Sequence, residues 1–213
     1  MKIELENVKP MDIEKRSFEI ITEELGDKKL LPGTELIVKR CIHTSADFDY
    51  AENLCFSENA VERALEAIKN GACIVTDTKM EKSGINKRDL SRYGGEVYCF
   101  MSDEDVAELA KKNGTTRATA SMDKAASLDK KLIFAIGNAP TALVRLYELI
   151  EEGKLSPELV IGVPVGFVNV VQSKVLIMEA DVPYIVARGR KGGSNIAACI
   201  CNALLYMIDN RRD

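Results

Sequence analysis

His43 is the only histidine in the 213 residues. An imidazole exchanges a proton near neutral pH, so this residue is the natural candidate for a general acid or base. It comes just after Leu36–Cys41, an apolar and β-branched run that predicts a strand, and three residues after Arg40. A structural histidine at the end of a strand is the alternative. One histidine with one nearby thiol is not a zinc-ligand pattern, so no metal site is expected.

A second candidate is the segment Arg188–Ser194, which lies between a predicted strand and a predicted helix. Adjacent glycines let backbone amides approach an anion, and the N-terminus of the following helix favours negative charge. Lys191, Gly192, Gly193 and Ser194 are therefore candidate ligand contacts, although a basic surface turn would have the same composition. Because Lys191 precedes the glycines, the segment is not a Walker loop, and its spacing does not match the dinucleotide fingerprint.

Two further segments carry hydroxyl groups next to an arginine. Thr115, Thr116 and Arg117 follow a glycine that ends a predicted helix, and the two hydroxyls with the guanidinium could bind a carboxylate. A capped helix start with an exposed arginine explains the same residues. Arg16 and Ser17 lie in the first predicted helix, where a solvated helix face is the ordinary interpretation.

The composition narrows the classes of partner and the compartment. The net charge is -4 and no tract is rich in lysine or arginine, so nucleic acid is not an expected partner. No run is long enough to span a membrane, and Met1–Val8 lacks the apolar core of a signal peptide. The six cysteines form no Cys-x-x-Cys pair and several lie in apolar runs, which indicates reduced thiols. We expect a cytoplasmic protein.

Short apolar runs alternate with amphipathic helical patterns along the whole chain. The predicted strands are Leu36–Cys41, Cys73–Thr76, Val97–Met101, Leu132–Ile136, Leu159–Val163 and Tyr184–Ala187. Predicted helices start at the caps Ser57 and Ser102, at Pro140, and near Asn195. This alternation predicts an α/β fold with a mostly parallel sheet and helices on both faces, in a Rossmann-like three-layer arrangement. With no linker in sight, residues 1–213 are expected to form one domain. Lys79–Glu96 is predicted to be a long, functional loop.

In an open α/β sheet, ligands bind beyond the carboxyl ends of the strands. The residues that follow the predicted strands supply glycine, amide, hydroxyl and cationic groups. These segments begin at His43, Asp77, Gly137, Pro164 and Arg188. Such a set suits a large ligand that carries several anionic groups. Gly137–Thr141 and Val163–Val168 could shape this pocket, or could only turn the chain. Cys199 and Cys201 are interpreted as packing residues.

Taken together, these motifs identify a family. From about Pro10 to Leu204 the chain resembles the precorrin-8X methylmutases. The matching stretches are Arg16–Phe18, Arg40–His43, Thr115–Arg117, Gly137–Leu143, Pro164–Val168, Ser173–Lys174 and Gly189–Ser194. Each stretch alone is weakly specific, but their order and spacing together are highly specific.

The resemblance implies an isomerase of cobalamin biosynthesis that moves a methyl group from C-11 to C-12 of a corrin precursor. It implies His43 as the proton donor or acceptor, and Arg16, Ser17, Arg40, Thr116, Arg117 and Lys191–Ser194 as substrate contacts. It also implies a homodimer with its sites near the interface. No cofactor is implied, because any cobalt is carried by the substrate. The broad, carboxylate-fringed substrate agrees with the distributed donors read from the residues.

The residues after His43 favour one branch of the family. Thr44–Tyr50, Arg92–Val97 and Cys99–Asp103 resemble the cobalt-dependent branch, which acts on cobalt-precorrin-8. The same methyl shift on metal-free precorrin-8X is the nearest alternative. Two other classes stay open: a protein that binds a corrinoid without converting it, and a phosphate- or nucleotide-binding protein that uses the Gly192–Gly193 turn.

Overall fold

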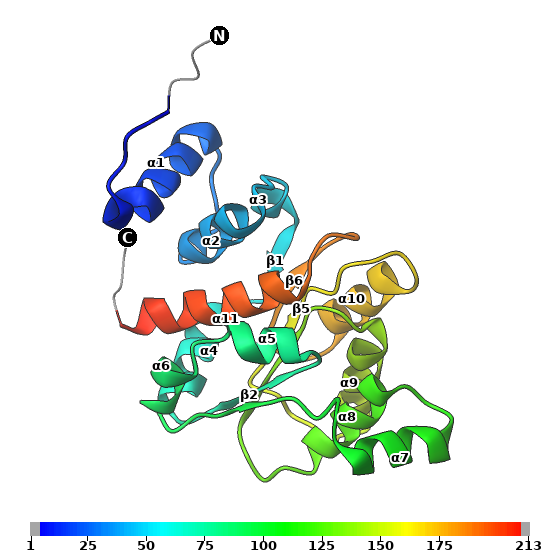
Figure 1. The fold of residues 1–213 in the computed structure, drawn as a ribbon. Coiled ribbons are helices and arrows are strands. Elements are labelled where there is room, and N and C mark those ends of the chain that lie inside the picture. The colour runs from blue at the N-terminus through cyan, green and yellow to red at the C-terminus, as the bar shows by residue number, and fades with distance from the viewer. Residues whose placement is uncertain (1–4, 210–213) are drawn as a thin grey trace.

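A computed structural model describes residues 5–209, which form one six-stranded sheet with helices on both faces (Figure 1). The strands are β1 (Leu54–Phe56), β2 (Cys73–Thr76), β3 (Val97–Tyr98), β4 (Leu132–Ile136), β5 (Leu159–Gly162) and β6 (Tyr184–Ala187). Their order across the sheet is β1-β6-β5-β4-β2-β3. All neighbours are parallel except β1, which pairs antiparallel with β6 at one edge. The predicted fold class is confirmed.

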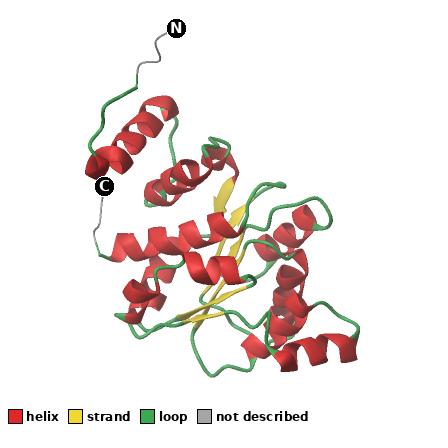
Figure 2. Cartoon of the chain, in the orientation of Figure 1, coloured by secondary structure: helices red, strands yellow, loops and turns green. Residues whose placement is uncertain are grey.

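Helices make up most of the remaining chain (Figure 2). They are a short 3-10 turn at Pro10–Asp12, α1 (Ile13–Leu25), α2 (Glu35–Ser45), α3 (Tyr50–Asn53), α4 (Ala60–Lys69), α5 (Lys79–Gly84), α6 (Lys87–Ser91), α7 (Glu104–Asn113), α8 (Arg117–Ala126), α9 (Pro140–Glu151), α10 (Val170–Glu179) and α11 (Ser194–Ile208). None of the described helices is long and apolar enough to cross a membrane.

The alternation of side chains along the strands divides the core into two layers. In β4, Ile133 and Ala135 face the layer that contains α2, α4 and α11, whereas Leu132, Phe134 and Ile136 face α8, α9 and α10. Every residue of β4 is buried, as expected for a central parallel strand that is covered on both faces. The continuous apolar runs predicted these central strands because both of their faces need apolar contacts.

The strand predictions for β2, β4 and β6 are correct to the residue, and β5 ends one residue early. The predicted strand Val97–Met101 contains only Val97–Tyr98. β1 was not predicted: it is three residues long and lies at the edge of the sheet, where a short strand leaves little periodic signal.

The predicted strand Leu36–Cys41 is wrong, because this segment lies within helix α2. Its buried residues are Ile37, Val38, Cys41 and Ile42, a helical spacing that places them on one face. Periodicity alone cannot distinguish a short apolar run in a buried helix from a buried strand. His43 consequently lies in the last turn of a helix, not after a strand.

The long functional loop predicted for Lys79–Glu96 is also wrong. The segment contains α5 and α6, and α5 begins with a capping box in which Thr78 and Glu81 each bind the backbone of the other. Two predicted caps lie outside their helices as well: α4 begins after Asn59 and α7 after Asp103, not after Ser57 and Ser102. The Ser57 hydroxyl instead accepts a hydrogen bond from the Tyr184 amide and so joins β1 to β6.

Candidate functional site

The C-terminal half of α2 presents three polar side chains on one face. Arg40, His43 and Thr44 are spaced at i, i+3 and i+4, which brings them together along a helix. His43 is exposed, and its ring lies 5.6 Å from the ring of Phe18 in α1. The helix therefore offers the imidazole to solvent while an aromatic ring supports one side of it.

Arg40 is the most enclosed of these side chains, with 14% of its side chain exposed. Its guanidinium lies over the rings of Tyr206 at 4.5 Å and Phe18 at 5.3 Å, and Nη1 donates to Glu14 at 2.9 Å. Aromatic faces attract a cation and hold it in place. Arg40 thus joins α1, α2 and α11, and its position next to His43 is fixed by packing.

Beside this face lies a hollow of about 360 Å³ between α2, α5 and α11. It is lined by Arg40, Thr44, Met80, Gly84, Ser194, Asn195, Ala198, Cys199, Asn202 and Tyr206. Thr44 donates to the Cys199 sulfur at 3.2 Å across the hollow. Hydroxyl, amide and guanidinium groups line it, which suits an anionic or polar group. Cys199 borders this hollow and is partly buried against the core, and Cys201 is buried, so both pack as predicted.

The segment Gly189–Ser194 reaches the end of α2 through Lys191. Its Nζ lies 2.7 Å from Asp47 and 2.5 Å from Asp49, which follow α2 in the chain. The hydrogen bond from Lys191 lowers the pKa of Asp47 below its usual value. The structure therefore brings the predicted loop and the predicted histidine to the same side of the molecule, but the ammonium of Lys191 is already paired.

Gly192 and Gly193 hold the loop against the turn after β5. The amide of Gly193 donates to the carbonyl of Val163 at 2.8 Å. Gly192 has φ +153°, and a Cβ there would overlap the same carbonyl. Both facts require glycine at position 192. The adjacent Phe167, which is exposed, lies 5.4 Å from the guanidinium of Arg190.

Ser194 begins α11 and contacts Thr78 at 3.0 Å between the two hydroxyls. Behind this contact lies Glu81, which is fully buried, and whose Oε2 accepts from the amides of Asp77 and Thr78. Burial and the neighbouring charge of Asp77 raise the pKa of Glu81 far above its usual value. We therefore treat Glu81 as a neutral acid that supports the N-termini of α5 and α11.

Asp77 lies at the switch point of the sheet, where its carboxylate binds the backbone that follows β4. The strand order reverses between β2 and β4, where a ligand crevice is expected in this class of fold. Here the Asp77 carboxylate accepts from three successive amides, those of Gly137, Asn138 and Ala139. These amides are thus engaged by the protein itself and are not left for a ligand anion. Burial raises the pKa of Asp77, and the three amide donors oppose that shift.

Thr116 and Arg117 lie at the start of α8, on the opposite face of the sheet from α2. Thr116 caps the helix by accepting from the Thr119 amide, and its hydroxyl contacts that of Thr141 at the start of α9. The capping interpretation is therefore correct for Thr116. Arg117 is exposed, and it forms no ion pair within the described part of the chain. Its guanidinium is available to a ligand.

Arg16 and Ser17 are not brought into the hollow. Arg16 pairs with Glu6 at 2.7 Å and with Glu19 at 3.5 Å, and the Ser17 hydroxyl donates to the Ile13 carbonyl within α1. Their nearest connection to the candidate site is the neighbouring Phe18, which contacts both Arg40 and His43. In this chain the solvated-face interpretation describes Arg16.

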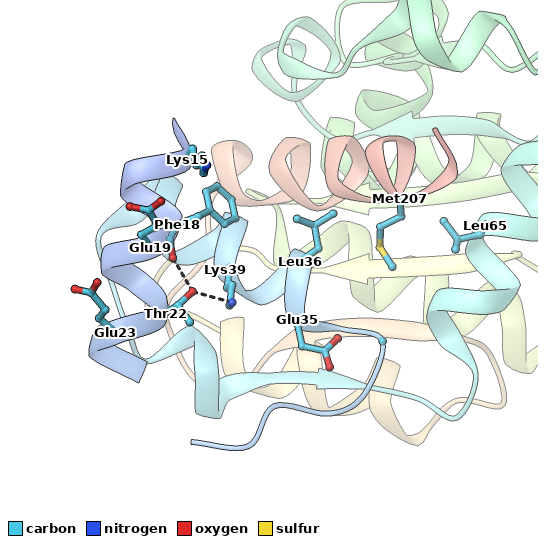
Figure 3. Close-up of a pocket in the computed structure, with 11 residues that line it drawn as sticks. Lys15, Phe18, Glu19, Thr22, Glu23, Glu35, Leu36, Lys39, Leu65 and Met207 are labelled. Carbon is cyan, nitrogen blue, oxygen red and sulfur yellow. Dashed lines mark hydrogen bonds between the residues drawn. The ribbon is translucent and has the colours of Figure 1, made fainter. Parts of the chain in front are cut away.

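A larger hollow of about 830 Å³ lies on the other side of α1, between α1, α2, α4 and α11. Figure 3 shows the carboxylates of Glu19, Glu23 and Glu35 on its rim, together with Lys15 and Lys39. Lys39 is bound to the Thr22 hydroxyl. The three carboxylates outnumber the two lysines, so this hollow is less suited to an anionic ligand.

Between residues 5 and 209, no group of three or more histidine, cysteine and acidic side chains could hold a metal ion. The hydroxyl, cationic and backbone groups of the candidate site instead suit an organic anion. Sequence reasoning missed Glu81 and the buried Lys174 as supports of the site. Their acidic and basic side chains resemble surface residues in the sequence, and only tertiary contacts reveal their burial.

Comparison with known proteins identifies the family. The precorrin-8X methylmutase model matches residues 12–207. The chain belongs to the precorrin-8X methylmutase family. It is therefore a methylmutase, an isomerase of corrin biosynthesis. The resemblance noted in the sequence is confirmed.

Individual relatives agree with this assignment to the precorrin-8X methylmutases. A cobalt-precorrin-8 methylmutase from Priestia megaterium is 45% identical over 203 residues, which cover 95% of this chain and 90% of the relative. The protein of the same name from Salmonella typhimurium is 45% identical, with 92% and 95% covered. The crystal structure of a precorrin-8x methyl mutase from Thermus thermophilus has a TM-score of 0.84 and 40% identity, and the match covers 94% of this chain and 98% of that one.

Proposed function

We propose that this methylmutase converts cobalt-precorrin-8 to cobyrinate, with His43 as the proton donor or acceptor. In the reaction the bond from the methyl group to C-11 breaks and a bond to C-12 forms, so atoms and electrons balance without a redox partner. A positioned proton and a fixed macrocycle are the main requirements of such a shift. Metal-free precorrin-8X as substrate is the alternative.

The placement of His43 is the observation that carries this proposal. It is exposed at the end of α2, on the same face as the partly enclosed Arg40 and beside the hollow. A broad macrocycle is larger than this hollow of about 360 Å³, so the rest of it would lie over the rim. The groups proposed to bind its carboxylates near this hollow are Arg40, Lys191, Gly192, Gly193 and Ser194, with Arg16 and Ser17 at the outer edge. Thr116 and Arg117, on the opposite face of the sheet, are proposed as substrate contacts from the family resemblance alone.

The charged groups that follow α2 suit a ligand that carries carboxylates. The nearest carboxylates after α2, Asp47 and Asp49, are paired with Lys191. Because both carboxylates are paired, they repel a ligand rich in carboxylates less than free carboxylates would.

The test of this role is His43→Gln. We expect turnover to fall by about 100-fold or more, while cobyrinate, measured by its absorption spectrum, binds with an affinity close to that of the unchanged protein. Glu35→Gln, at the other end of α2, is the matched control and should keep full activity. Unchanged turnover in His43→Gln would remove His43 from the mechanism.

The substrate branch needs a separate experiment. Incubation with cobalt-precorrin-8 and with metal-free precorrin-8X, followed by absorption spectroscopy, should give faster conversion of the cobalt compound. The identity of about 45% to relatives named cobalt-precorrin-8 methylmutase supports this expectation. Faster conversion of the metal-free compound would overturn it, and binding without conversion of either would favour a carrier protein.

The proposal also covers assembly and location. We propose a homodimer with the sites near the interface, as the family resemblance implies, and light scattering should give about twice the mass of the 23.5 kDa chain. We further propose the cytoplasm, because all six cysteines are free thiols. Cell fractionation tests the location. The single domain proposed for 1–213 includes residues 1–4 and 210–213, which lie outside the described residues.

A further inference from the structure

Lys174 is the only basic residue among the buried side chains of the described chain, with 1% of its surface exposed. It lies in the middle of α10, beneath the segment Gly189–Lys191. Removing an ammonium from water is costly unless other groups replace the lost hydration. The contacts of Lys174 must therefore include groups that replace the hydration lost on burial.

Those contacts are backbone carbonyls. The Lys174 Nζ donates to Gly189 O at 2.9 Å and to Lys191 O at 2.8 Å. Within residues 5–209, no carboxylate forms an ion pair with it. Burial alone lowers its pKa to about 8. The ammonium of Lys174 thus binds the backbone of the loop.

The carbonyl between these two is also held by the protein, because Arg190 O accepts from the Gly166 amide at 3.1 Å. Three successive carbonyls, from 189 to 191, are therefore bound by donors of the protein. The peptide bonds are trans, so in each unit the N–H points opposite to the carbonyl. The amides of Arg190, Lys191 and Gly192 consequently point away from the donors that hold the carbonyls.

These three amides have no acceptor among the hydrogen bonds of the described residues. Arg190 and Lys191 are exposed and Gly192 is half-buried, so a ligand can reach them. The amides of Arg190 and Gly192 both point away from Lys174, and neighbouring amides that point the same way attract an anion. Here they stand over a buried ammonium, which adds positive potential from below.

We propose that Lys174 is a positioning residue: its ammonium holds the carbonyls of Gly189 and Lys191, so that the amides of Arg190 and Gly192 on the opposite side bind a carboxylate of the substrate. This inference rests on the proposed function and deepens it, because it assigns one carboxylate of the corrinoid to the backbone of this loop. Lys174 itself does not touch the substrate.

A bound carboxylate near the loop stabilises the ammonium form of Lys174, so ligand binding and protonation are linked. Binding slightly above pH 8 should therefore take up a proton. The titratable or charged groups on the elements packed against Lys174 are Glu179 of α10, Arg145, Tyr147, Glu148 and Glu151 of α9, Tyr184 of β6, and Arg188, Arg190 and Lys191 of the loop. None of them is a cause of its shifted pKa, and the part of the uptake that is lost on substitution of Lys174 is the part assigned to Lys174.

The experiment is calorimetric titration of the full chain with cobyrinic acid, at about pH 8.5, in two buffers that differ in ionisation enthalpy. The unchanged protein should take up a proton on binding. Lys174→Met should bind about tenfold more weakly, which corresponds to the loss of one charge-assisted interaction, and should take up no proton through this group. Lys154→Met removes an exposed lysine and is the matched control.

Because Lys174→Met could fail to fold, Lys174→Arg keeps the inference testable. An arginine stays charged at this pH, so this variant should bind cobyrinic acid with less dependence on pH between 7 and 9.5 and with no proton uptake. Equal proton uptake in the unchanged protein and in either folded variant would overturn the inference. Absence of cobyrinic acid binding and of turnover in the unchanged protein would instead overturn the proposed function.

Discussion

Individual residues of the candidate site differ in how strictly the backbone dictates them. Gly192 is the strictest: its φ of +153° and the nearby Val163 carbonyl leave no room for a side chain. Gly189 also has positive φ, at +80°, but nothing lies within 4 Å of a Cβ built there. These two glycines of one loop therefore separate the cost of backbone conformation from the cost of a collision.

Replacing each of these two glycines with alanine separates the two costs. Gly192→Ala should raise KM by about tenfold or more, because a displaced loop misplaces the groups that bind substrate. Gly189→Ala bears only the cost of positive φ, about 1–2 kcal/mol, and should change KM much less. Steady-state kinetics with thermal unfolding of each variant checks this. Equal KM values for the two variants would show that the loop does not position substrate.

At the scale of elements, Asp77 joins the end of β2 to the start of α9. Its carboxylate accepts hydrogen bonds from the backbone amides of residues 137–139. It therefore occupies the position at the switch point where a ligand anion could otherwise bind. The same turn approaches Glu81, since a Cβ at Gly137 would overlap Glu81 Oε1. The N-termini of α5, α9 and α11 are thus fixed relative to one another by one buried acidic pair.

The second prediction concerns this connection. Asp77→Asn offers only one acceptor oxygen to three amides, one buried and two partly buried, so we expect a loss of about 2–4 kcal/mol of unfolding free energy. Asp105→Asn makes the same chemical change at an exposed residue paired with Lys124 and should cost much less, because solvent screens an exposed ion pair. Urea denaturation of both variants provides the measurement. A loss in Asp77→Asn no larger than in Asp105→Asn would contradict the role assigned to Asp77.

At the scale of the whole molecule, burial of Glu81 links stability to pH. Its pKa is raised in the folded protein and ordinary in the unfolded chain, so the folded state binds the proton more tightly. The stabilising effect is complete below the ordinary value of about 4.3 and is lost as pH rises towards the raised value. Lys174 acts in the opposite sense, since the cost of burying its charge is relieved above about pH 8.

The stability that Glu81 contributes should therefore decrease as pH rises. Between pH 6 and 9.5 the melting temperature of the unchanged protein should fall more than that of Glu81→Gln, which keeps a neutral side chain of similar shape. Thermal melts followed by circular dichroism across this range test the difference. Glu96→Gln alters an exposed acid and should preserve the slope of the unchanged protein. Parallel curves for the unchanged protein and Glu81→Gln would show that Glu81 is not neutral in the fold.

The amino-acid sequence by itself determined the family, the three-layer class and the central strands. Buried parallel strands need apolar residues on both faces, and the turns that carry the family motifs have strict residue requirements. For α2 the local pattern was ambiguous, because the apolar run Leu36–Val38 with Cys41 and Ile42 suits a buried helix as well as a strand.

Only the tertiary structure decided which polar groups are occupied and which face a ligand. It showed that Lys191 is paired with Asp47 and Asp49, that Asp77 occupies the amides at the switch point, and that Lys174 lies beneath the loop. Each of these contacts joins residues 15 or more positions apart. Burial and partner choice at that separation depend on how layers pack, so no local pattern of residues could specify them.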